Sequence, residues 1–111
     1  MITPARFRSL ALALTGVEEV PHDGLASFRT KRRKIATLTA EGAHAFLPFD
    51  RELQRTFCED LPDVFVPMPG GLGAMGHTVV DLRHVREAHL ASALAASHAL
   101  ASEPKKRPKR R

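Results

Sequence analysis

The longest regular pattern of apolar positions lies near the C-terminal end of the chain. From His84 to about Ser102, apolar and small residues recur three and four positions apart, which predicts an amphipathic helix that Pro104 ends. His89 falls within the apolar arc, and we interpret it as a core or partly buried side chain rather than a ligand. The arc consists of Val85, His89, Leu90, Ala93, Leu94, Ala96, Ser97 and Leu100.

Two shorter helices are predicted upstream of this one. Thr3 is a suitable N-cap, and Pro4 a suitable first residue, for a helix that reaches about Leu14. Asp50 is the expected N-cap of a second helix over residues 51–61, because apolar residues in this segment fall on one side of a helix.

Short runs of apolar and β-branched residues separate the first two predicted helices. Residues 25–30, 34–40 and 43–49 are predicted to form three strands of one meander. An extended segment with a turn at residues 22–24 leads into them, since Pro21 and Gly24 break any longer element.

Two further strands are predicted after the second helix, over residues 64–68 and 77–82. Pro67 and Pro69 place the first of them at a sheet edge or end it early. The predicted order is helix, three strands, helix, two strands, helix, without alternation of single strands and helices. This order indicates the α+β class, with helices packed on one face of an antiparallel sheet.

The net charge of +5 is not spread evenly along the 111 residues. Six of the 17 Lys and Arg lie in residues 103–111 with one of the 12 Asp and Glu, so residues 1–102 carry equal numbers of acidic and basic side chains. The last nine residues contain no apolar side chain and two prolines, which predicts a single domain over 1–102 and a disordered basic tail over 103–111. The basic residues of this tail are Lys105, Lys106, Arg107, Lys109, Arg110 and Arg111.

A second basic cluster, RTKRRK, occupies the predicted tip of the first hairpin at residues 29–34. Long cationic side chains on a projecting element are suited to contact nucleic-acid phosphates. The alternative is an ordinary solvated segment whose charges prevent pairing between sheet edges. The cluster contains Arg29, Lys31, Arg32, Arg33 and Lys34.

The segment Gly71-Leu72-Gly73-Ala74-Met75-Gly76 matches the dinucleotide-binding pattern GxGxxG. That motif requires a helix directly after it and an acidic residue about 20 positions further on. Here HTVVDL follows, which predicts a strand, and the later position lies in an Ala-rich run without a carboxylate. We therefore expect no nucleotide cofactor, and interpret the glycines as a flexible connection between two strands.

Two blocks of sequence, LTGVEEVPHDGLASFRTKRRKIATL and DVFVPMPGGLGAMGHTVVDL, resemble the MmcQ/YjbR-like proteins. The resemblance covers about residues 5–101 and implies a frataxin-like (CyaY-like) sandwich, also described as a double-wing arrangement. Members are described as DNA-binding proteins, so the resemblance implies that function here, with the glycine segment as a second wing. The matching residues are Gly16, Val17, Glu18, Glu19, Pro21, His22, Phe28, Pro67, Gly71, Gly73, Gly76, Thr78 and Asp81.

The chain departs from the family pattern in three places. Similar proteins usually have Trp where this chain has Leu72 and His77, and often Gly at the tip of the first hairpin, where this chain has basic residues. The basic tail is also not part of the pattern. Any contact that the glycine segment makes with a partner would therefore use the imidazole of His77 and backbone amides in place of an aromatic ring.

The sequence therefore predicts a bacterial, non-enzymatic module that binds DNA through sequence-independent phosphate contacts from the hairpin and the tail. The alternative is a protein-interaction or small-ligand module that uses the sheet face and the region of His22 and His77, a pair that we expect near Glu18 or Glu19. Neither a GxSxG motif nor a nucleophile–base pair is present, and no His spacing is typical of a metal site. No metal or cofactor is expected.

The remaining features concern the cellular compartment. The single cysteine, Cys58, is interpreted as a half-buried helix residue, and the absence of a partner for a disulfide favours a reducing, cytoplasmic environment. No run of apolar residues is long enough to cross a membrane. Arg6 and Arg8 before LALALTG faintly resemble a signal peptide, but the helical spacing of the apolar residues favours an ordinary first helix.

Overall fold

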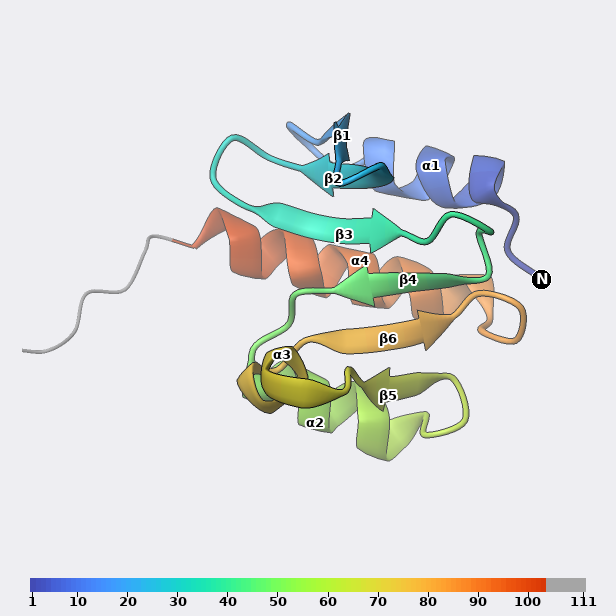
Figure 1. The fold of residues 1–111 in the computed structure, drawn as a ribbon, viewed down its shortest axis with the longest axis vertical. Coiled ribbons are helices and arrows are strands. Elements are labelled where there is room, and N and C mark those ends of the chain that lie inside the picture. The colour runs from blue at the N-terminus through green and yellow to red at the C-terminus, as the bar shows by residue number, and fades with distance from the viewer. Residues whose placement is uncertain (104–111) are drawn as a thin grey trace, which may run out of the picture.

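One antiparallel sheet organises the chain in the computed structural model, which describes residues 1–103 (Figure 1). Within these residues six strands pair in the order β1-β2-β3-β4-β6-β5. The strands are β1 (Glu18–His22), β2 (Leu25–Arg29), β3 (Lys34–Leu38), β4 (His44–Leu47), β5 (Phe65–Pro67) and β6 (Thr78–Asp81). The helices are α1 (Pro4–Leu12), α2 (Arg51–Asp60), α3 (Gly70–Met75) and α4 (Glu87–Ser102).

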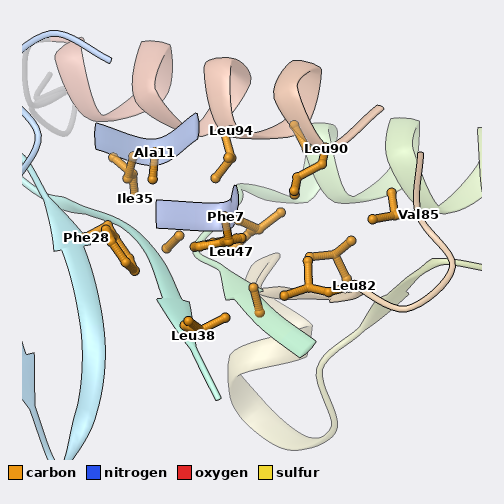
Figure 2. Packing of buried hydrophobic residues seen from close by; sticks show 14 of the residues in the cluster. Phe7, Ala11, Phe28, Ile35, Leu38, Leu47, Leu82, Val85, Leu90 and Leu94 are labelled. Atoms are coloured by element: carbon orange, nitrogen blue, oxygen red, sulfur yellow. The ribbon is translucent and has the colours of Figure 1, made fainter. Parts of the chain in front are cut away.

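The core lies between one face of the sheet and the helices α1 and α4, which Figure 1 shows behind it, with α2 behind β5. Burial alternates along β4, where Ala45 and Leu47 are buried and their neighbours are not, as expected for a sheet with one covered face. In Figure 2, Leu90 and Leu94 point from α4 toward this face. The predicted α+β class, with helices packed against an antiparallel sheet, is confirmed.

Both edge strands of the described sheet carry a proline, Pro21 in β1 and Pro67 in β5. A proline has no backbone N–H to offer to a further strand, so each edge is a poor template for pairing with another chain. The prediction that the Pro67 strand lies at an edge is confirmed.

The segment before β2 is more regular than the sequence indicates. It forms the five-residue strand β1, which pairs antiparallel with β2 over its whole length. The connection is a two-residue turn in which Asp23 and Gly24 have φ of 54° and 80°. Two consecutive positive φ values give the turn whose twist matches a hairpin, so this short segment becomes a strand despite its proline.

Two predicted helix boundaries shift. The first helix ends at Leu12 rather than Leu14. The last helix begins at Glu87 rather than His84, because Asp81 closes a turn: its carbonyl accepts from the Val85 N–H at 3.0 Å. The Asp81 carboxylate also lies 2.8 Å from Nδ1 of His84 and accepts from the Arg83 N–H.

A buried hydroxyl fastens α4 to the sheet. Ser97, which is 2% exposed, donates from Oγ to the carbonyl of Ile35 in β3 at 2.7 Å. We expect Ser97→Ala to lower the free energy of unfolding by about 1 kcal/mol, the typical net contribution of such a bond. Ser102→Ala is the control, since its hydroxyl is exposed and, among residues 1–103, bonds only to the His98 carbonyl within α4. Urea unfolding followed by circular dichroism measures both, and equal losses would show that the Ser97 bond contributes nothing specific.

Candidate nucleic-acid interface

One end of the sheet collects segments that are distant in the sequence. The register pairs Arg29 with Lys34 at the tip of the β2–β3 hairpin, and Leu47 with Thr78 where β4 ends and β6 begins. Figure 1 shows this hairpin, helix α3 and the C-terminal end of α4 on the same side of the molecule. The basic cluster and the glycine segment therefore lie at the same end of the fold.

The hairpin tip is held by a single side chain. Oγ1 of Thr30 accepts hydrogen bonds from the N–H groups of Arg32 and Arg33, at 3.1 and 3.2 Å. The Thr30 N–H donates to the Arg33 carbonyl at 2.9 Å, which closes the turn. This framework leaves Lys31, Arg32 and Arg33 with exposed side chains, whereas Lys34 is half-buried.

The five cations of the cluster are not equivalent. Arg29 is half-buried and donates from Nε to the neighbouring Thr30 carbonyl at 3.1 Å. Arg32 donates from Nη1 to the Glu103 carbonyl at 3.2 Å, so the hairpin is tied to the end of α4. The predicted tail cations, at positions 105–107 and 109–111, lie outside the described residues, but the chain leaves Glu103 beside this hairpin.

Two clefts flank the hairpin. The larger, of about 610 Å³, is bounded by the hairpin, the β4–α2 junction, the start of β6 and the end of α4. It brings Arg33 and Lys34 to the same cleft as His77. The smaller, of about 460 Å³, is lined by Lys31 and Arg32 together with Glu18.

His77 is fixed through its backbone rather than its ring. Its N–H donates to the Leu72 carbonyl at 3.0 Å, and its own carbonyl accepts from the Met68 N–H and from Nε2 of Gln54. Burial lowers the pKa of the imidazole, and the charge of Lys34 lowers it further.

His22 and His77 do not form a pair. His22 is exposed at the far end of β1, opposite Leu25, whereas His77 precedes β6, with strands β2, β3 and β4 between. Glu19 pairs with Arg8 of α1 instead, with Oε1 and Nε 3.0 Å apart. The expected grouping of the two histidines near these glutamates is therefore wrong.

The glycine segment is a short helix, not a flexible connection. Gly70 and Gly76, with φ of 81° and 122°, enter and leave α3 in conformations that favour glycine. A Cβ at Gly73 would lie 1.6 Å from the Met68 carbonyl oxygen, and one at Gly76 would lie 2.5 Å from that of Phe49. The prediction of a strand after Gly76 is confirmed. Close packing explains Gly73 and Gly76.

Gln54 is a residue of this site that the sequence alone does not reveal. From α2 its side-chain amide donates to the Gly73 carbonyl at 2.8 Å and to the His77 carbonyl at 3.0 Å, so one side chain holds both ends of the α3–β6 connection. The only sequence signal is its spacing, since Gln54 lies next to Leu53 and three residues before Phe57 on the apolar side of the helix.

Other motif residues are structural. Phe28 is fully buried, and its ring meets that of Phe7 edge to face with centroids 5.4 Å apart. Thr78 is fully buried and donates to the Gly76 carbonyl at 2.8 Å. Gly71 is exposed, and a Cβ there would meet nothing within 4 Å.

The described part of the chain shows neither a cluster of metal ligands nor a membrane-spanning helix. Residues 1–103 contain no group of three or more His, Cys, Asp or Glu side chains arranged to hold a metal ion. In the same residues no helix is both long and apolar enough to cross a membrane. Cys58 is half-buried on α2, as predicted, and burial raises the pKa of its thiol.

The fold is similar to the crystal structure of the Deinococcus radiodurans protein DR2400, which contains the domain DUF419. The TM-score is 0.75 and the sequence identity 22%, and the match covers 93% of this chain and 80% of that one. DUF419 is the YjbR/MmcQ-like family, so the fold of a family protein agrees with the one that the sequence resemblance implies. No family model and no curated protein sequence matches the chain.

Proposed function

We propose that this chain belongs to the MmcQ/YjbR-like family and binds DNA through sequence-independent phosphate contacts. The observation that carries the proposal is the presentation of Lys31, Arg32 and Arg33 with exposed side chains on a hairpin tip whose backbone Thr30 holds. A preformed tip loses little conformational entropy on binding, and cationic side chains on it can contact successive phosphates of one strand.

Acidic residues nearby restrict the contact to the tip. Glu18 lines the smaller cleft, while Asp50 and Glu103 line the larger one. A duplex laid across the whole end of the sheet could not avoid these carboxylates, because its phosphates are evenly spaced along both strands. The hairpin therefore reaches one strand, and the six cations after Glu103 in the sequence add phosphate contacts from an adjacent point.

The experiment is fluorescence anisotropy with a labelled duplex at about 50 and 200 mM salt, comparing the unmodified chain with the triple variant Lys31→Gln, Arg32→Gln, Arg33→Gln. We expect binding at least about tenfold weaker at the lower salt, and a salt dependence whose slope falls by about 0.9 for each phosphate that the variant no longer neutralises. A chain that ends at residue 103 should show a further, separate decrease in affinity.

The control removes the same number of charges elsewhere. Arg55, Arg83 and Arg86 are exposed and lie on α2 or at the opposite end of the sheet, so their replacement with Gln should change affinity only through net charge. Equal decreases in both triple variants would indicate binding without a defined surface. Unchanged affinity after hairpin neutralisation and tail removal would contradict the proposal.

A further inference from the structure

The cleft of about 610 Å³ between the hairpin and α3 has the size of a small-molecule site, since such sites typically enclose about 300–1,000 Å³. Its polar lining is unusual for a chain whose first 102 residues are neutral overall. Three basic side chains line it from two segments of the fold: Arg33 and Lys34 from the β2–β3 hairpin, and His77 from just before β6.

The two carboxylates that also line the cleft, those of Asp50 and Glu103, form no ion pair with Arg33 or Lys34 in the described part of the chain. Asp50 also lines the cleft, but its carboxylate Oδ1 accepts from the Leu53 N–H at 2.9 Å as the N-cap of α2. Glu103 lies at the rim, where its carbonyl accepts from Arg32.

The pKa of the His77 imidazole also reflects the basic groups of the cleft. The charged groups that face it are Arg33 and Lys34 from the hairpin, Asp50 from the start of α2, and Glu103 from the end of α4. If the carboxylates dominated, they would raise the pKa of the imidazole. Burial lowers it instead, and the charge of Lys34 lowers it further, so Lys34 acts on the ring more strongly than either carboxylate does.

Apolar groups line the rest of the cleft. Met75 is 64% exposed there although it is a large apolar side chain, and Pro48 and Leu100 are half-buried. An anion with an apolar or planar body can cover these groups while its charge lies near the cations.

We propose that this cleft binds a phosphate monoester carried on a nucleoside-sized body, whether a free mononucleotide or the 5′ end of a DNA strand. A guanidinium and an ammonium together match the charge of a phosphate monoester, which is close to a dianion at neutral pH. This site shares Arg33 with the exposed tip, whereas Lys34 and His77 line the cleft and are not part of the tip. Binding of a nucleotide in the cleft does not require duplex binding by the hairpin.

The test is calorimetry of the full chain with deoxyadenosine 5′-monophosphate, deoxyadenosine and inorganic phosphate. We expect the nucleotide to bind at least tenfold more tightly than either fragment. Lys34→Gln and Arg33→Gln, two separate variants, should each weaken it at least fivefold. Arg86→Gln, at the opposite end of the sheet, should leave it unchanged. Nucleotide binding no tighter than that of phosphate, or equal in all three variants, would overturn the proposal.

Two further measurements separate the outcomes. The imidazole pKa of His77, followed by proton NMR, should rise when the nucleotide is added, because an anion in the cleft favours the protonated ring; no rise would place the nucleotide elsewhere and overturn the proposal. A single strand with a 5′-phosphate that binds more tightly than its 5′-hydroxyl form identifies a strand end as the ligand, and equal binding identifies the free nucleotide. Duplex binding without nucleotide binding would overturn this inference alone, and the reverse would overturn only the proposed function.

Discussion

Gly73→Ala is expected to lower the free energy of unfolding by about 3 kcal/mol, at the upper end of overpacking costs. The added methyl would lie 1.6 Å from the Met68 carbonyl oxygen and 2.7 Å from its carbonyl carbon, which are backbone atoms that cannot rotate away. Helix α3 would have to move, and the hydrogen bond from Gln54 to the Gly73 carbonyl would be strained with it.

Gly71→Ala is the matched control, two residues earlier in the same helix. A methyl there meets nothing within 4 Å and the backbone is not in the left-handed region, so alanine should stabilise the chain by up to about 0.5–1 kcal/mol. Urea unfolding of the two variants should therefore give changes of opposite sign. Similar changes would show that α3 does not pack on Met68 as described.

The glycines of the GxGxxG pattern have different roles in this chain and in a dinucleotide site. In a dinucleotide site the first glycine makes a tight turn, the second lets the pyrophosphate approach the backbone, and the third lets the helix pack closely on the strand. Here Gly73 and Gly76 are required by other parts of the protein, and Gly71 is not. The pattern is therefore a packing motif of the α3 connection, which places His77 at the cleft.

The sequence predicts the elements with strong local signals and misses those that depend on distant contacts. Helix α4 and the strands of the meander follow from periodicity. Helix α3 does not, because three of its six residues are glycine, and among the 20 residue types only proline is a poorer helix former. Gln54, from α2, supplies the stabilising contact, and a local pattern contains no such information.

The same distinction applies to the candidate site. The basic hairpin can be found directly, since its cations are consecutive in the sequence. The cleft cannot, because it depends on β6 lying between β4 and β5, which brings the start of β6 to the hairpin end of the sheet. For the same reason the sequence suggests that His77 lies near His22. In the fold His77 lies near Lys34 instead, whose charge lowers the pKa of its imidazole.

The second large effect is expected for Phe28→Ala, which should lower the free energy of unfolding by about 3–5 kcal/mol. Phe28 is fully buried, packs edge to face on Phe7, and joins β2 to α1, so its removal leaves a cavity between sheet and helix. Phe46→Ala is the control: Phe46 is half-buried, and the alternation along β4 places it on the opposite face, so its effect should be clearly smaller.

The comparison also tests the role of Phe28, one of the residues in which the sequence resembles the MmcQ/YjbR-like proteins. If Phe28 acts only through the core, Phe28→Leu, which refills most of the volume, should restore most of the stability and bind the duplex as the unmodified chain does. A decrease of duplex affinity in Phe28→Leu at a temperature where the variant is folded would instead mean that this ring positions the hairpin. Since β2 runs directly from Phe28 into the basic cluster, the two outcomes separate a purely structural motif from one that also orients the binding surface.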